Sequence, residues 1–242
     1  MNSKINSKSP PILCKFCRNK AKLRTKTVTF CSSSYGENQP NNNSKTTITQ
    51  VPQTEACTVG FKTLRTCKLG ISRYPDFVYN AEGGSGTGSG TRVMSDSKEN
   101  TELSVLFDIG TLYIPPLTST TTKFLGLPLP PFLKIDIVPE AFQGSINQES
   151  GEVALEFKAR FLFSVGSIYR APPLMVKTVL TTEESKGTIR SGRGKKLDEG
   201  GNCRLVGVAT VDPIDDFLMN SFLGLPTECL ACLNAVISFS IS

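Results

Sequence analysis

The chain has 242 residues, of which 20% are charged, and it contains eight cysteines but no histidine. Nowhere does it hold the run of about 20 apolar residues that a membrane-spanning helix needs. Because histidine is the commonest general base and metal ligand, its absence disfavours an enzyme. We therefore predict no catalytic residue, no metal site and no cofactor.

The formal net charge of +6 is unevenly distributed along the chain. Nine basic residues and one acidic residue lie in the first 50 positions, a net charge of +8, which leaves −2 for residues 51–242. The basic character therefore belongs to the N-terminal segment. We expect the folded part to bind no nucleic acid.

Residues 1–50 are rich in Ser, Thr, Asn and Lys and poor in acidic residues, a composition typical of an organelle transit peptide and a disordered leader. The excess of Lys over Arg and the many hydroxyl groups favour a chloroplast protein, in the stroma or on the stromal face of a membrane. We expect cleavage somewhere in residues 30–60. A disordered tail on a cytosolic protein is the alternative interpretation.

The folded part is predicted as a single β domain over residues 55–242. Residues 61–74 give a weak strand signal, and a short strand over residues 77–81 leads into a glycine-rich run from Gly83 to Gly90. No Gly-Lys-Ser/Thr and no helix follow this run, which argues against a phosphate-binding loop. We interpret residues 83–102 as a flexible glycine-rich loop.

The central stretch, residues 152–163, alternates apolar odd positions with mostly charged even positions. Successive side chains of a strand point to opposite faces, so this pattern predicts an antiparallel strand with one buried and one wet face. We predict further strands over residues 103–113, 133–138, 142–146, 174–182, 203–211 and 234–241.

These strands follow one another with short connections, which indicates an all-β antiparallel meander forming a barrel or a sandwich. One short helix is predicted near residues 213–223. Asp212 would cap it and Pro213 would fit its first turn. Ile214, Phe217, Leu218 and Phe222 would fall on one apolar stripe of this helix.

Two identical strings, Phe124–Pro128 and Phe222–Pro226, are apolar where loops are normally polar. Such loops either cover the core or form the rim of a hydrophobic site. The predicted ligand or partner rim comprises Phe124, Leu125, Leu127, Leu129, Phe132, Phe222, Leu223 and Leu225.

One basic cluster in the folded part is either a solvated hairpin tip or a contact for anions such as lipid head groups. It comprises Lys186, Arg190, Arg193, Lys195 and Lys196.

The cysteine pairs Cys14–Cys17 and Cys229–Cys232 are separated by far more residues than is usual in a zinc site, which argues against a shared zinc ion. Cys229 and Cys232 are either a redox couple or buried thiols.

These features predict a non-catalytic plastid protein that binds an apolar small molecule (a lipid, an isoprenoid or a pigment) or a membrane surface. Two alternatives remain: an assembly or scaffold factor for a plastid protein complex, and an enzyme with an unrecognised site. The sequence identifies neither the ligand nor the partner, and it does not distinguish a barrel from a sandwich.

Overall fold

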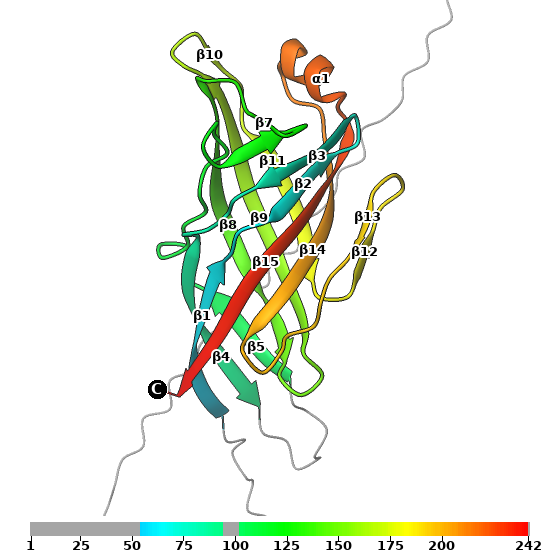
Figure 1. The fold of residues 1–242 in the computed structure, drawn as a ribbon. Helices are drawn as coiled ribbons and strands as arrows, with labels where there is room; N and C mark the ends of the chain where they lie inside the picture. The colour runs from blue at the N-terminus through cyan, green and yellow to red at the C-terminus, as the bar shows by residue number, and fades with distance from the viewer. Residues whose placement is uncertain (1–53, 94–101, 242) are drawn as a thin grey trace, which may run out of the picture. The chain divides into compact units, whose positions relative to one another are not determined.

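The computed structural model describes residues 54–93 and 102–241, and it confirms the all-β prediction (Figure 1). Its strands form one 13-stranded antiparallel sheet and a separate two-stranded hairpin. The helix α1 (Phe217–Leu223) follows the penultimate strand. No helix of the described residues has the length and apolar character needed to cross a bilayer.

The strands of the large sheet are β1 (Thr54–Thr63), β2 (Cys67–Ile71), β3 (Tyr74–Tyr79), β4 (Ser85–Val93), β5 (Glu102–Phe107), β6 (Thr122–Phe124), β7 (Leu127–Pro128), β8 (Leu133–Asn147), β9 (Glu152–Val165), β10 (Tyr169–Arg170), β11 (Leu174–Thr181), β14 (Asn202–Val211) and β15 (Thr227–Ile241). The hairpin consists of β12 (Glu184–Lys186) and β13 (Ser191–Arg193).

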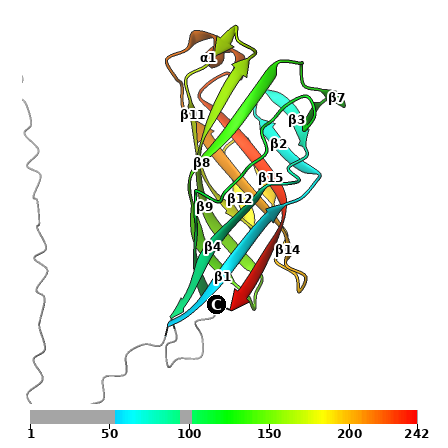
Figure 2. The ribbon, with the colours of Figure 1, turned by 90° about the vertical axis from the view of Figure 1, so that its left-hand side faces the viewer.

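Eight of these strands form a ring of hydrogen-bonded neighbours in the order β1, β4, β5, β8, β9, β11, β14 and β15, and β15 pairs with β1 to close it (Figures 1 and 2). The weakest junction lies between β11 and β14, where the ladder pairs only Thr181 with Val206. Here the Thr178 hydroxyl donates to the carbonyl of Val208 at 2.8 Å. A side chain thus reinforces the junction.

The ring branches along its length. The C-terminal part of β15 pairs with β1, whereas its earlier part, Cys229–Cys232, pairs with β2, which continues through β3 and β6 to β7. On the other side, β5 pairs with the end of β8, and Leu117 bridges to Ile135 near its start. One half of the ring is therefore walled by β1, β4 and β5, and the other by β2, β3 and β6.

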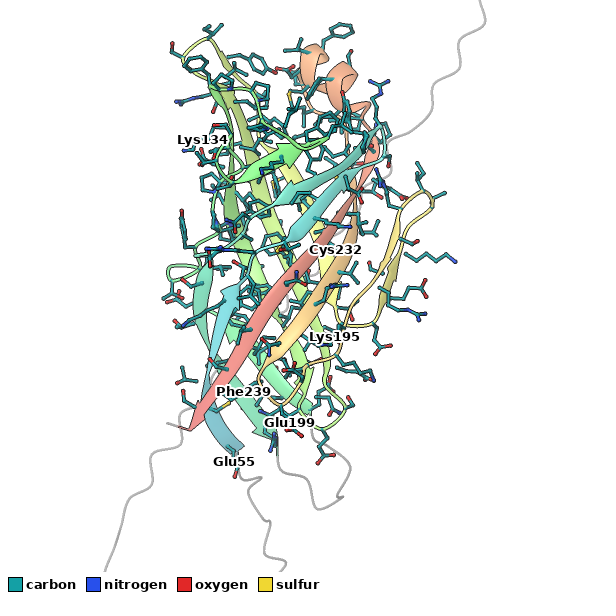
Figure 3. All side chains as sticks on the ribbon, in the orientation of Figure 1. Glu55, Lys134, Lys195, Glu199, Cys232 and Phe239 are labelled. Atoms are coloured by element: carbon teal, nitrogen blue, oxygen red, sulfur yellow. The ribbon has the colours of Figure 1, made fainter. Side chains whose placement is uncertain are left out.

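We name these halves the far half and the α1 half. Lys134 lies toward the α1 end of the molecule, and Glu55 and Phe239 lie at the opposite end (Figure 3). The far half holds one cluster of buried side chains, including Val59, Leu155 and Ile237. A second cluster, from Cys67 to Leu223, lines the α1 half.

The predicted alternation of the central strand is confirmed in β9. Val153, Leu155 and Ala159 are fully buried inside the ring, whereas Glu152 and Arg160 are exposed. The preceding strand pairs with β9 as an antiparallel hairpin, with Phe142 opposite Phe157. The two predicted strands before it are one strand, β8, interrupted by a register shift between Pro139 and Ala141.

The prediction of a flexible loop over residues 83–102 is wrong for its first half, because Ser85–Val93 form β4 between β1 and β5. A Cβ atom on Gly88 would lie 2.5 Å from the Leu106 carbonyl oxygen, and one on Gly90 would lie 2.8 Å from the Cys57 sulfur. Glycine is required there by close packing. Residues 94–101 lie outside the described part.

The helix is also shorter than predicted. It begins at Phe217, and its N-cap is Asp216 rather than Asp212, because the Asp216 carboxylate accepts the Met219 amide at 2.8 Å. Two residues of the predicted apolar stripe, Phe217 and Leu218, are 87% and 59% exposed, and the side chains that the helix buries are Met219 and Leu223. The helix therefore presents an apolar face to solvent.

Candidate functional site: an apolar cavity

The α1 half of the ring encloses a cavity of about 370 Å³. Nearly every strand that walls this half contributes to it, with Phe77 from β3, Ile137 from β8, Phe161 from β9, Val176 from β11 and Leu233 from β15. None of the described residues that line it carries a charge. Its size lies within the range of roughly 300–1,000 Å³ that is usual for small-molecule sites.

Most polar groups in the wall already bond to the protein backbone. The Tyr79 hydroxyl donates to the Pro115 carbonyl, and the Thr63 hydroxyl donates to Ala81 at 2.5 Å. Burial raises the pKa of Tyr79, so this side chain stays neutral. The wall therefore offers a guest mainly hydrocarbon surface.

The cavity reaches the surface beside α1. Phe222, in α1, lines it and is about half exposed. The Tyr74 ring lies 5.6 Å from Phe222 and 6.2 Å from Phe124, so it joins the two identical apolar strings at this opening. The Tyr74 hydroxyl also donates to the Phe222 carbonyl at 2.6 Å, which ties the β2–β3 turn to the helix.

The predicted rim residues divide into two groups. Five line the cavity: Phe124, Leu129, Phe222, Leu223 and Leu225. The other three, Leu125, Leu127 and Phe132, are between 70% and 78% exposed and do not line it. The structure thus brings together residues of the two apolar strings, and it points part of the first string outward.

The outward residues belong to a larger exposed apolar group, which we call the apolar crown. It comprises Leu125, Leu127, Phe132, Ile168, Phe217 and Leu218. Its segments are connected, because the Gly166 amide donates to the Phe132 carbonyl at 2.9 Å and the Tyr169 hydroxyl donates to Asp216 at 2.8 Å. Residues 124–133, 165–169 and 217–226 contain no charged side chain.

The basic cluster is partly used within the fold. The Arg190 guanidinium donates to Asp76 and to the carbonyls of Ile71 and Tyr74, at 2.6–2.8 Å. Lys196 pairs with Glu152 at 2.8 Å. The other members, Lys186, Arg193 and Lys195, are exposed. Of the five predicted anion contacts, the structure therefore leaves these three without an ion pair among the described residues.

A buried carboxylate holds the β12–β13 hairpin against the ring. Glu228 accepts the backbone amides of Thr188, Ile189 and Arg190 at 2.7–2.8 Å. These hydrogen bonds hold the pKa of Glu228 below its usual value. The carboxylate points away from the cavity, because it alternates with the inward Thr227 and Cys229.

The described cysteines are free. Cys229 lines the cavity, and burial raises its pKa to about 11, so it is a neutral thiol at ordinary pH. Cys232 is three residues further along the same strand, so its side chain points to the opposite face. No group of possible metal ligands is present in the described part, and Cys14 and Cys17 lie outside it.

Sequence reasoning missed that Phe157 and Phe161 line a cavity, since their inward position alone predicts packed core. It also missed Tyr74, whose segment showed no clear period, and Tyr79, which was predicted only as part of a short strand. Both tyrosines lie near proline-rich or apolar turns. Such turns occur beside a cavity wall and beside a packed hydrophobic core alike, so they do not reveal a cavity. The geometry alone identifies this cavity as the candidate site.

Compared with protein-family models, with curated proteins and with solved structures, the chain matches none of them.

Proposed function

We propose that this protein binds an apolar small molecule, such as a lipid, an isoprenoid or a pigment, inside the cavity of the α1 half. The supporting observation is an uncharged cavity of about 370 Å³ whose wall includes the half-exposed Phe222 of α1. Closed rings of eight strands have room for one small ligand. Burying each large apolar group of such a ligand contributes about 1.5–3 kcal/mol.

Filling the cavity tests this proposal. Ala209 and Val176 line it from β14 and β11, so Ala209→Phe or Val176→Phe should reduce binding of the hydrophobic fluorophore phenylnaphthylamine at least tenfold. Overpacking costs roughly 1–3 kcal/mol, so a thermal melt must first show that each variant is folded. Ala154→Phe, on the exposed face of β9, is the matched control and should bind normally.

Normal binding by folded Ala209→Phe and Val176→Phe would contradict the proposal. Native mass spectrometry of the protein after gentle purification gives a second readout. A retained small molecule supports the cavity function. A retained protein partner and an empty cavity would instead favour the scaffold alternative.

A second candidate function, contact with a membrane surface, is favoured by the apolar crown. Solvent exposure of Phe132, Ile168 and Phe217 at one end of a small protein is typical of an interaction surface. Leu125→Asp combined with Ile168→Asp should abolish co-flotation with phosphatidylcholine vesicles. Val179→Asp, at an exposed apolar position on β11, is the control that should leave flotation unchanged.

We also propose a plastid location, supported by the acid-poor, hydroxyl-rich composition of residues 1–50. N-terminal sequencing of the protein isolated from its organism should give a mature end in residues 30–60. Recovery of a protein that still begins at Met1 would contradict the plastid proposal.

A further inference from the structure

The buried polar side chains of the described residues are almost all hydrogen-bonded. Five of them have partners: Thr63, Thr122, Thr178, Thr182 and Glu228. The exception is Thr227, which is only 6% exposed and whose hydroxyl has no hydrogen bond among the described residues. A buried polar group without a partner is unusual and costs stability, so it calls for an explanation.

Thr227 borders the cavity. It is the first residue of β15, and it alternates with Cys229, Ala231 and Leu233, which line the cavity from the same strand. The only fully enclosed side-chain nitrogen or oxygen that lacks a partner in the described part is Arg92 Nε, so the Thr227 oxygen keeps some accessible surface. Because the Thr227 side chain lies on the same face of β15 as Cys229 and Ala231, its hydroxyl is within reach of a molecule in the cavity.

The charge of the wall restricts the ligand further. A carboxylate or phosphate moved from water into this cavity would meet no cation among the described lining residues. Transferring an unpaired ion to such an environment is very unfavourable. A neutral oxygen pays a much smaller desolvation cost, and a hydrogen bond with the Thr227 hydroxyl would offset it.

We infer that the cavity takes an uncharged, mostly hydrocarbon molecule with one oxygen that hydrogen-bonds to the Thr227 hydroxyl. This inference rests on the proposed small-molecule function and specifies its ligand class. Thr227 follows α1 closely, so the oxygen lies at the α1 end of the cavity. The hydrocarbon part extends toward Phe142 and Phe157, in the middle of the ring.

The test compares four probes of about twelve carbons each: dodecane, lauryl alcohol, methyl decyl ketone and laurate. Each displaces phenylnaphthylamine from the full chain, from Thr227→Val and from Thr178→Val. Thr178 lines the same cavity, but its hydroxyl already bonds to Val208, so Thr178→Val is the matched control. A net hydrogen bond corresponds to roughly a three- to tenfold difference in affinity.

We expect the alcohol and the ketone to bind the unmodified protein roughly three- to tenfold more tightly than dodecane, and laurate to bind most weakly. The preference for the oxygen should vanish in Thr227→Val and persist in Thr178→Val. Laurate binding as tightly as the alcohol, or an oxygen preference that survives Thr227→Val, overturns the inference and leaves the small-molecule function standing. Failure of every probe, and of the fluorophore itself, overturns both.

Discussion

At the scale of single residues, Thr227 and Thr178 differ only in whether the hydroxyl has a partner, although both line the cavity. In the empty protein, Thr227→Val removes a buried group that is unsatisfied, so the free energy of unfolding should rise by about 1 kcal/mol. Thr178→Val removes a hydrogen bond across the β11–β14 junction and should lower that free energy by a similar amount. Urea unfolding measures both.

A fall in stability for Thr227→Val would mean that its hydroxyl has a stabilising role in the empty protein. The two substitutions are a matched pair because each exchanges a hydroxyl for a methyl group in a strand. Since valine and threonine both favour strands, backbone propensity contributes little to either result.

Leu127 lies in the first apolar string and Leu129 just beyond it, yet they are 70% and 6% exposed. Leu127→Asp should change the free energy of unfolding by no more than about 0.5 kcal/mol, as exposed substitutions usually do. Leu129→Asp places an unpaired charge in the wall and should cost about 3–5 kcal/mol. Thermal melts of the two variants measure the difference, and equal effects would contradict the exposure of Leu127.

At the scale of elements, the β12–β13 hairpin depends on the Glu228 carboxylate, which accepts three amides of its turn. The pKa of Glu228 is lower in the folded protein, so its contribution to stability is present above the unfolded pKa of about 4.3. That contribution is lost as the pH falls through the folded pKa. Acidification should therefore loosen the hairpin.

Glu228→Gln should lower stability at neutral pH and flatten the loss of stability below about pH 4.3. Urea unfolding across this pH range measures the effect. Glu184→Gln is the control, because Glu184 is exposed on the same hairpin and forms no ion pair among the described residues. An unchanged pH profile in Glu228→Gln would show that other carboxyl groups dominate acid unfolding.

Local pattern predicted most of the long strands, because alternation of period two is a property of neighbouring residues. It failed for β4, where the apparent flexibility of Gly86, Gly88 and Gly90 hides a requirement set by other strands. It also identified an apolar stripe on α1, but such a stripe is buried only where another element covers it. Phe217 of this stripe is 87% exposed.

The candidate site was predictable only in part. Phe124 and Phe222 attract notice as apolar loop residues, and the structure places both in the wall of one cavity. The cavity itself follows from the branch of the ring, which depends on pairings such as Leu117 with Ile135. Such a long-range bridge between an irregular segment and a strand leaves no periodic signal in the sequence.

At the scale of the whole molecule, one ring combines a packed half with a hollow half. The strand β9 runs through both: Val153 and Leu155 belong to the packed cluster, whereas Phe161 and Phe163 line the cavity. Regions with fewer buried contacts open more readily, and their amides exchange hydrogen faster. The two ends of one strand can therefore be compared directly.

In the empty protein, we expect the amides of Phe161 and Phe163 to exchange faster with deuterium than those of Val153 and Leu155. A bound ligand contacts only the folded state of the α1 half, so it should slow exchange there and stabilise the fold by mass action. Lauryl alcohol is a suitable probe. If the amides at both ends of β9 were equally protected from exchange, with and without the alcohol, the ring would open only by global unfolding. The hollow half would then be no less stable than the packed half.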